Sequence, residues 1–492
     1  MLKARAWQVN AVNQCVSMAI GGSDRALVFA CPGSGKTIAG LLIAIGLRER
    51  TKIGKGRKVI VLTPNLAIKS QWIERSCDLG LNLVAIEDAR VLLAGVDDMF
   101  SGGFIITYQQ AISMRASLRL FCDTHKPIAI LDEVHHTSGP AGERDGNEWG
   151  VSILHSLAHA AFKLATTGTP FRQGSNPIAF VNYNDDDRAH AHVEYGYKQA
   201  ILDRICRPIV FEIYDGMVEW TDAKGISYAA DFNTPLTKSK RLELLRAAVS
   251  IDGQFPLRMF EDAHKRLLEV RAEPGGERSG GLVVAMNVQH AEAIADALTV
   301  ISGTRPVVVH NKVDDSLDLI NAFRDGDALW IVGIKMLSEG VDIPRLRVGV
   351  YCTNIQAALY FHQFCGRMTR VQSNDLERAY VFMPGAAELQ VTARQIETDV
   401  AHALGEDVPI REPSGRRRGR SGMAGILIES SNGANVSSIG SGHVVPVAYI
   451  REHESTIREY RDTPGLRNLT QVELVIVLVR TGVLPPFQDK AA

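Results

Sequence analysis

Short apolar runs alternate with longer helical patterns over two regions of the chain. In the first region, from Leu27 to Thr169, the apolar runs lie at 26–29, 59–62, 104–106 and 128–131. The alternation returns in a second region, with apolar runs at 282–285, 306–309, 329–332, 348–351 and 379–382. Continuous apolar runs of this length, separated by helical patterns, are typical of parallel strands that helices cover on both faces. We therefore predict an α/β fold with two lobes in tandem, each built on a parallel sheet.

Two interruptions of this pattern divide the chain. Residues 171 to about 280 hold a helical pattern, a pair of strand-like runs and a Gly-rich loop, which we interpret as a connector. After about residue 400 the alternation stops, and an Arg- and Gly-rich stretch has the composition of a flexible basic linker. We expect an N-terminal lobe at 1–198, a connector or insertion at 199–280, a C-terminal lobe at 281–400, a basic linker at 401–422 and a small C-terminal unit of undetermined role at 423–492.

The composition is that of an ordinary folded protein. The chain has 492 residues, of which 46% are hydrophobic and 22% charged, and this length is enough for two or three domains with separate cores. The formal net charge is −1. Any binding to nucleic acid must therefore come from local basic strips and backbone donors rather than from a positive surface as a whole.

Cysteine usage and the length of the apolar runs bear on location. The seven cysteines are scattered without a CxxC pair, which argues against a disulfide framework or a zinc site and fits a reducing cytosol. The N-terminal residues lack the apolar core and cleavage site of a signal peptide. No apolar run reaches the roughly 18 residues of a membrane span. We expect a cytoplasmic protein without a membrane segment.

A glycine-rich loop follows the first apolar run. Residues 30–37 read Ala-Cys-Pro-Gly-Ser-Gly-Lys-Thr and stand between a strand pattern and a helical pattern, which is the context of a P-loop. The glycines let backbone N–H groups surround phosphates, Lys36 neutralises the β- and γ-phosphates, and the Thr37 hydroxyl binds Mg²⁺. A chance Lys-Thr in a glycine-rich turn is the alternative, and the flanking strand and helix speak against it. We predict ATP and Mg²⁺ as cofactors, bound by Pro32, Gly33, Ser34, Gly35, Lys36 and Thr37.

An acidic pair follows a later apolar run of the same region. Asp132 and Glu133 come directly after residues 128–131, where side chains of a parallel sheet emerge beside a phosphate loop. There Asp132 can hold Mg²⁺, and Glu133 can orient and deprotonate the attacking water. Alone, such a pair is often a helix N-cap or a solvated loop. After a P-loop, hydrolysis is the better interpretation, whereas His135 and His136 lack the further ligands of a zinc site.

The ordered motifs resemble superfamily 2 helicases of the DExH class, in the branch that includes the ATPase subunits of restriction enzymes. The resemblance covers residues 1 to about 385 and implies two RecA-like lobes. Ala30 stands at the first glycine position of the P-loop pattern, as in many helicases of this kind. The sequence Arg-Ala-Trp-Gln at 5–8 looks like the family's N-terminal motif, in which Gln8 reads the adenine.

The resemblance also implies contacts to nucleic acid from the first lobe. Thr63-Pro64-Asn65 and Thr107-Tyr108-Gln109 follow strands at which the family contacts a nucleic-acid backbone, although either motif could equally cap a helix. Thr167-Gly168-Thr169-Pro170 resembles the motif that links the nucleotide site to the strand. The implied nucleic-acid contacts in this lobe are Thr63, Pro64, Thr107, Thr167 and Thr169.

Two further motifs fall in the second lobe. Residues 338–344 match the motif that touches both ATP and the nucleic-acid backbone, which implies strand contact by Ser338 and nucleotide contact by Gly340 and Asp342. Residues 363–370 match the arginine-finger pattern Gln-x-x-Gly-Arg-x-x-Arg, with Gln363, Arg367 and Arg370 in catalytic roles. The alternative for these arginines is a solvated helix face.

Together the motifs imply an ATP-dependent DNA helicase or translocase that hydrolyses ATP between two lobes. Because the expected contacts are mainly to the phosphate backbone of the nucleic acid, we predict little sequence preference and binding that weakens with salt. DNA is favoured over RNA because the motifs look closer to DNA translocases than to RNA remodelers. Two alternatives stay open: an RNA-dependent ATPase, and a nucleotide-gated DNA sensor in a defence or repair complex. Because no nuclease carboxylate cluster is recognisable, cutting would need a nuclease or other protein partner.

Overall fold

The fold is described from a computed structural model. It describes residues 4–93, 102–137, 148–168, 178–181, 183, 190–222, 224–310, 316–334, 343–371 and 378–404, with short pieces at 428–429, 435–436, 453–461, 478 and 483–484. The chain divides into two compact units, called unit 1 and unit 2 below. Unit 1 comprises Met1–Arg207, Glu339–Asp342 and His362–Leu376, and unit 2 comprises Pro208–Ser338, Ile343–Phe361 and Glu377–Ala492.

Unit 1 is built on a seven-stranded parallel sheet with the order β3-β4-β2-β5-β6-β1-β7. The strands are β1 (Arg25–Ala30), β2 (Val59–Thr63), β3 (Val84–Ala85), β4 (Gly103–Thr107), β5 (Ile128–Leu131), β6 (Phe162–Thr167) and β7 (Val193–Tyr195). Its helices are α1 (Ala6–Ile20), α2 (Lys36–Arg50), α3 (Leu66–Asp78), α4 (Ala89–Leu93), α5 (Tyr108–Ser113), α6 (Arg115–His125), the short 3-10 helix η1 (Val134–His136), α7 (Glu148–Ser156) and α8 (Tyr197–Leu202).

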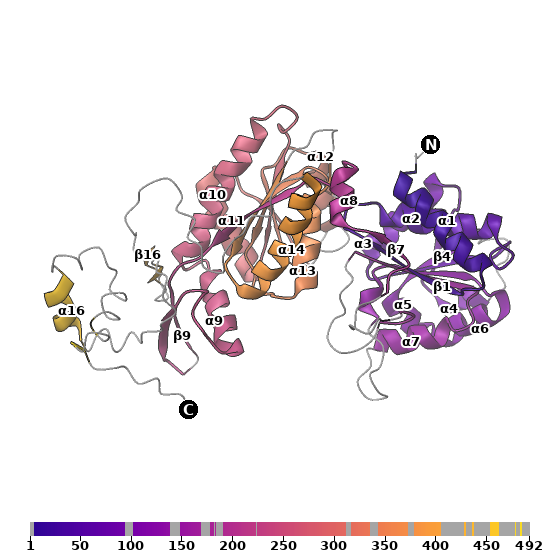
Figure 1. Ribbon diagram of the computed structural model, residues 1–492, viewed down its shortest axis with the longest axis horizontal. Helices are drawn as coiled ribbons and strands as arrows, with labels where there is room; N and C mark the ends of the chain where they lie inside the picture. The colour runs from indigo at the N-terminus through magenta and orange to yellow at the C-terminus, as the bar shows by residue number, and fades with distance from the viewer. Residues whose placement is uncertain are drawn as a thin grey trace. The chain divides into compact units, whose positions relative to one another are not determined.

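Helices cover both faces of this sheet. Figure 1 shows α1 and α2 on one side of the strands and α5, α6 and α7 on the other. The central strands are buried along their whole length, as in β2 and β5, which is why their sequences are continuously apolar. The predicted parallel sheet with helices on both faces is confirmed for this unit.

Strand order places three chain segments at one edge of the sheet. β6 lies between β1 and β5, with Phe29 paired to Thr167 and Leu131 paired to Ala165. Because all three strands are parallel, their carboxyl ends meet at the same edge. The loops that follow β1, β5 and β6 are therefore neighbours in space, although they are far apart in sequence.

Unit 2 is built on a six-stranded parallel sheet with the order β12-β13-β11-β14-β15-β8. The strands of this unit are β8 (Ile209–Tyr214), the antiparallel pair β9 (Val218–Thr221) and β10 (Ser227–Ala230), β11 (Gly280–Val284), β12 (Val307–Val309), β13 (Trp330–Gly333), β14 (Leu346–Tyr351), β15 (Ala379–Pro384) and a second short antiparallel pair, β16 (Ile428–Glu429) and β17 (Asn435–Val436). Its helices are α9 (Lys238–Ala248), α10 (Gln254–Arg271), α11 (Val288–Ser302), α12 (Ser316–Asp325), α14 (Ala387–Leu404) and α16 (Glu454–Arg461), and α13 (Ala358–Met368) runs from this unit into the segment grouped with unit 1.

The second parallel sheet confirms the predicted tandem of two RecA-like lobes. One element lies where the sequence did not place it: β8, within the segment interpreted as a connector, pairs with β15 and forms an edge of the sheet. None of the described helices combines the length and the hydrophobicity that a bilayer crossing requires.

Asn287 offers a test of the fold of unit 2. Its side chain accepts a hydrogen bond from the backbone N–H of His290 at 2.9 Å and caps α11. We expect Asn287→Ala to cost about 1 kcal/mol, because an N–H of the first turn loses its partner. Hydrogen–deuterium exchange of peptides from α11 should speed up in this variant and stay near the wild-type rate in Asn287→Ser. Equal exchange in both variants would contradict the role of the cap.

Candidate nucleotide site

The phosphate loop connects β1 to α2. Gly33 and Gly35 have φ angles of 83° and 94°, in the left-handed region that favours glycine. Gly35 is the N-cap of α2, so the chain enters the helix at Lys36 and Thr37. The first backbone N–H groups of a helix have no partner within the helix, and with the helix dipole they favour an anion there. The loop therefore has the backbone conformation that its sequence predicts.

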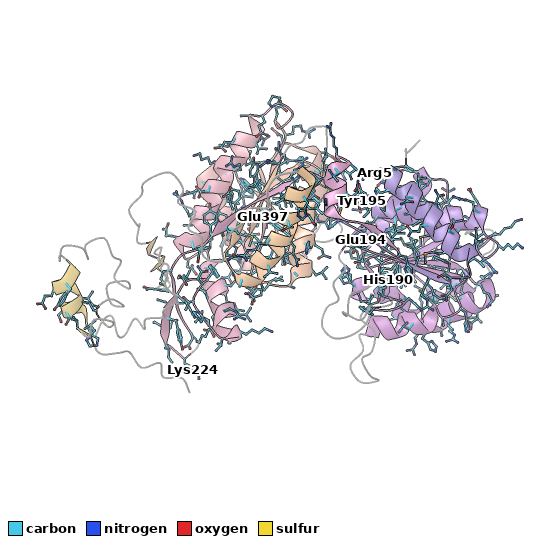
Figure 2. All side chains as sticks on the ribbon, in the orientation of Figure 1. Arg5, His190, Glu194, Tyr195, Lys224 and Glu397 are labelled. Atoms are coloured by element: carbon cyan, nitrogen blue, oxygen red, sulfur yellow. The ribbon has the colours of Figure 1, made fainter. Side chains whose placement is uncertain are left out.

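The residues before and at the start of α1 hold this loop from outside. Arg5 Nη1 and Trp7 Nε1 both donate to the carbonyl oxygen of Ser34, at 2.6 and 3.2 Å. Gln8 is buried, and its Nε2 donates to the carbonyl oxygen of Gly35 at 3.0 Å. The Trp7 ring stacks on Tyr195 of β7 at 4.7 Å between centroids, and Figure 2 labels Arg5 and Tyr195. The structure thus places Gln8 on the backbone of the phosphate loop.

The acidic pair lies directly after β5. Asp132 is 4% exposed and receives hydrogen bonds on both carboxylate oxygens: Thr166 and the N–H of Glu133 donate to Oδ1, and the indole of Trp72 donates to Oδ2. Tyr108 donates its hydroxyl to the backbone oxygen of Asp132 at 2.8 Å. These donors fix both the orientation of the carboxylate and the path of the chain.

Glu133 meets the phosphate loop. Its Oε1 lies 2.5 Å from Lys36 Nζ, and its Oε2 accepts the backbone N–H of Gly168 at 3.1 Å. Its φ of 47° lies in the left-handed region, where a non-glycine residue carries strain of the kind found at functional sites. A Cβ atom at Gly168 would overlap Lys36 Nζ. A side chain at position 168 would therefore displace the Lys36 ammonium from its place beside Glu133.

Burial and the ammonium group of Lys36 shift the pKa values of the neighbouring carboxylates and of His135. Burial raises the pKa of Glu133, but Lys36, His135 and the N–H of Gly168 outweigh burial and lower it to about 2. Burial and the neighbouring Glu133 charge raise the pKa of Asp132. Burial lowers the pKa of His135 to about 3, so this ring is neutral at neutral pH. The site holds an ionised Glu133 and a neutral His135.

The last two residues of β6 contact Asp132 and His135. Thr166 donates to Asp132 as described, and Thr167 Oγ1 lies 3.0 Å from His135 Nδ1. Sequence reasoning assigned Thr167 to nucleic acid and did not identify Thr166. Because Thr166 and Thr167 are adjacent in one strand, their side chains point to opposite faces and can contact different partners.

A segment late in the sequence packs on the phosphate loop within unit 1. A Cβ atom at Gly366 would overlap the Pro32 ring, and Thr369 Oγ1 lies 3.5 Å from the Pro32 oxygen. A Cβ atom at Gly33 would lie 3.3 Å from Cγ of Arg370. Cys206 also reaches this place, with its thiol donating to the Pro32 oxygen at 3.6 Å. Arg370 is therefore beside the loop that carries Lys36.

The other predicted site residues are placed as follows. Gln363 is buried and Arg367 is half-buried at the end of α13. Thr63, Thr107 and Thr167 are buried, with Thr107 accepting from the Gln110 N–H as the cap of α5, and Asn65 caps α3. Pro64 is half-buried between β2 and α3. The helix-cap alternative thus describes Asn65 and Thr107 correctly. Thr169, Ser338, Gly340 and Asp342 lie outside the described residues.

Three residues of this site carried no recognised sequence signal. Arg5 stands in the N-terminal motif but was not singled out, and Thr166 precedes a motif residue. Trp72 lies within a helical pattern, where a large apolar side chain is normally assigned to the core. Only the fold shows that its indole N–H reaches the carboxylate of Asp132.

His135 gives a pH test of this geometry. Its pKa is about 3 in the folded chain against 6.5 for an ordinary histidine, so the unfolded state takes up a proton first as pH falls below about 6.5. The stability that the neutral His135 contributes should be fully present above about pH 6.5 and should decrease as the pH falls toward 3. We expect His135→Gln to decline less steeply, by up to about 1.4 kcal/mol per pH unit. Urea denaturation of both proteins at neutral pH and about pH 5 measures this difference, and parallel curves would contradict it.

Comparison with known proteins agrees with the architecture. Residues 1–172 match the family model described as type III restriction enzyme, res subunit. An uncharacterized protein of Mycobacterium tuberculosis is 34% identical over 416 residues, covering 83% of this chain and 65% of the relative. The chain thus spans about 65% of the length of this relative.

Two more distant proteins share most of the chain. The DNA 3'-5' translocase XPB2 of Sulfurisphaera tokodaii is 21% identical over 398 residues, which cover 76% of this chain and 81% of that protein. A fragment described as an HsdR subunit of a type I restriction enzyme from Vibrio vulnificus has the same fold, with a TM-score of 0.55 and 17% identity over 79% of this chain and 65% of that chain. The resemblance predicted from the motifs is confirmed. The chain is similar to superfamily 2 helicases along most of its length, and residues 1–172 match the family of the type III restriction enzyme res subunit.

Proposed function

We infer that the chain is an ATP-driven DNA motor. One observation carries this proposal: Lys36 Nζ, the Glu133 carboxylate and the N–H of Gly168 meet at the end of the sheet, with Arg370 beside the same loop. An ammonium group, an ionised carboxylate and an arginine around a P-loop are the groups that phosphoryl transfer to water requires. The names of relatives support DNA as the track, since XPB2 is a DNA translocase.

The charges of the site fit a divalent cation. The buried carboxylate of Asp132 lies next to the half-buried carboxylate of Glu133, and Lys36 forms an ion pair with Glu133. Within the described parts of the chain, no cation pairs with Asp132. An uncompensated buried carboxylate is costly, and carboxylate and hydroxyl oxygens are ligands that Mg²⁺ prefers. Asp132 and Thr37 would hold the ion, which neutralises developing phosphate charge when bound.

The other residues of the site have separate roles in ATP binding and hydrolysis. Backbone N–H groups from Gly33 to Thr37 bind the phosphates, and Lys36 holds their negative charge. Glu133 orients the attacking water and accepts its proton, for which its ionised state at neutral pH is suited. Arg367 and Arg370 stabilise the charge of the transition state, with Gln363 from the same motif beside them in sequence. Gln8 contacts the adenine while it holds the loop.

Binding of the DNA strand would occur at the loops after β2, β4 and β6. The hydroxyls of Thr63, Thr107 and Thr167 are buried, which leaves the backbone and half-buried neighbours such as Pro64 and Asn65 to face a strand. Thr169, Ser338, Gly340 and Asp342 keep the roles that the motifs imply. Contact through backbone groups suits a chain with a net charge of −1 and predicts binding to phosphates without sequence preference.

The choice of nucleic acid is tested by ATP turnover of the full chain. We expect stimulation by DNA of about 10-fold, because a ligand that favours the hydrolysis-competent state shifts the equilibrium by a coupling of this order. Single-stranded DNA, duplex DNA and RNA are compared at one salt concentration. Stimulation by RNA alone would replace DNA with RNA as the track. If none of the three nucleic acids changes ATP turnover, the result contradicts a nucleic-acid motor. If DNA stimulates turnover, a labelled duplex shows whether its strands are separated.

The role of Glu133 is tested by Glu133→Gln, which keeps the side-chain shape and removes the base. We expect turnover to fall at least about 100-fold, since general-base catalysis contributes 10²- to 10⁴-fold, while ATP still binds. Lys36→Ala should weaken ATP binding itself. The matched control is Glu87→Gln, because Glu87 also lies 2.5 Å from a buried lysine, Lys69, but not at the phosphate loop. Wild-type turnover by Glu133→Gln would refute its role.

A further inference from the structure

Trp72 connects three parts of unit 1. It lies in the middle of α3 and is fully buried. Its Nε1 donates to Asp132 Oδ2 at 2.7 Å. This bond is charge-assisted, because the acceptor is a carboxylate, and such bonds are roughly twice as strong as neutral ones. Trp72 therefore acts on the residue that we assign to the metal ion.

The indole ring also packs against the helix that carries Lys36. A Cβ atom at Gly40 of α2 would lie only 2.7 Å from Cη2 of Trp72. Glycine at 40 is therefore what lets the ring pack closely against α2. One side chain thus touches both the helix of the phosphate loop and the acidic box.

Helix α3, which carries Trp72, begins next to residues 63–65, where we expect contact with DNA. Asn65 caps α3 through a 3.0 Å hydrogen bond from the Ile68 N–H, and Leu66 in its first turn is 63% exposed. A helix of this length moves as a rigid element, so a shift at Asn65 is carried to Trp72 two turns away. If bound DNA displaces α3, the hydrogen bond from Trp72 to Asp132 therefore changes.

The two oxygens of Asp132 differ in how they are held. Oδ1 accepts from Thr166 and from the Glu133 N–H, both of which belong to the nucleotide site. Among the described residues, Oδ2 accepts from Trp72. The orientation of this oxygen thus depends on the position of α3.

We propose that Trp72 is a positioning residue that couples DNA binding at the start of α3 to nucleotide binding, by orienting the carboxylate of Asp132. The inference rests on the proposed function, since it requires that DNA binds at residues 63–65 and that Asp132 serves the nucleotide site. Because coupling between two sites is reciprocal, nucleotide must change the affinity for DNA by the same factor.

The test uses binding alone. The affinity of the full chain for a fluorescent DNA is measured by anisotropy, with and without Mg²⁺ and a non-hydrolysable ATP analogue, and the ratio of the two affinities is the coupling. In the wild type we expect a ratio of about 5 to 150, the usual range for allosteric coupling. In Trp72→Phe, which keeps a ring but lacks the N–H donor, the ratio should fall to about 1.

Two matched controls separate coupling from stability. Trp330→Phe removes the N–H of another buried tryptophan, which donates to His264 in unit 2, and should keep the wild-type ratio. Gly40→Ala presses on the Trp72 ring, whereas Gly46→Ala in the same helix presses on Val12 at an equal 2.7 Å. We expect Gly40→Ala to lower the ratio and Gly46→Ala to leave it unchanged. This second pair keeps the test decisive if Trp72→Phe does not fold.

The possible results are distinct. A wild-type ratio above about 5 that persists in Trp72→Phe or in Gly40→Ala overturns the role of Trp72 and leaves the motor function intact. A wild-type protein that binds no DNA, or whose ratio is about 1, overturns the proposed function and this inference together. Equal loss in Trp72→Phe and Trp330→Phe identifies a general effect of destabilisation and overturns the inference.

Discussion

The site depends on the burial of three charged groups at the end of one sheet. Asp132 is buried and Lys36 and Glu133 are half-buried, and removing a charge from water is costly unless it is paired and hydrogen-bonded. Lys36 offsets the charge of Glu133, and Gly168 supplies a further donor. These groups come from segments after β1, β5 and β6. The parallel sheet brings them together because β6 lies between β1 and β5, so the carboxyl ends of the three strands are neighbours.

The same constraint explains the many donors around Asp132. A carboxylate that is 4% exposed must receive hydrogen bonds from the protein, and Thr166 and Trp72 provide them from different elements. Each donor also ties the carboxylate to its own strand or helix. Helix α3 and strand β6 are therefore both hydrogen-bonded to the carboxylate of Asp132. The hydrogen bond that Trp72 donates thus both satisfies a buried carboxylate and carries the coupling that we propose.

The sequence predicted those features that have a local physical cause. The phosphate loop was recognisable because left-handed backbone at Gly33 and Gly35 favours glycine, and the strands were recognisable because buried parallel strands are continuously apolar. A strand was predicted in the region of β8 but was assigned to the connector, since its partner β15 is distant in the chain and pairing leaves no local pattern. Trp72 was missed for the same reason: its bond to Asp132 exists only after folding. The helix-cap alternatives for Asn65 and Thr107 describe both residues correctly, because a cap is a local feature of the sequence.

The contact between Gly366 and Pro32 limits which sequences can carry this site. A Cβ atom at 366 would overlap the proline ring, so every other amino acid separates the end of α13 from the loop. No conservative replacement exists at this position, unlike at an apolar core position, where side chains of similar volume exchange at small cost. Across diverging descendants of this gene, position 366 should thus vary less than apolar core positions do.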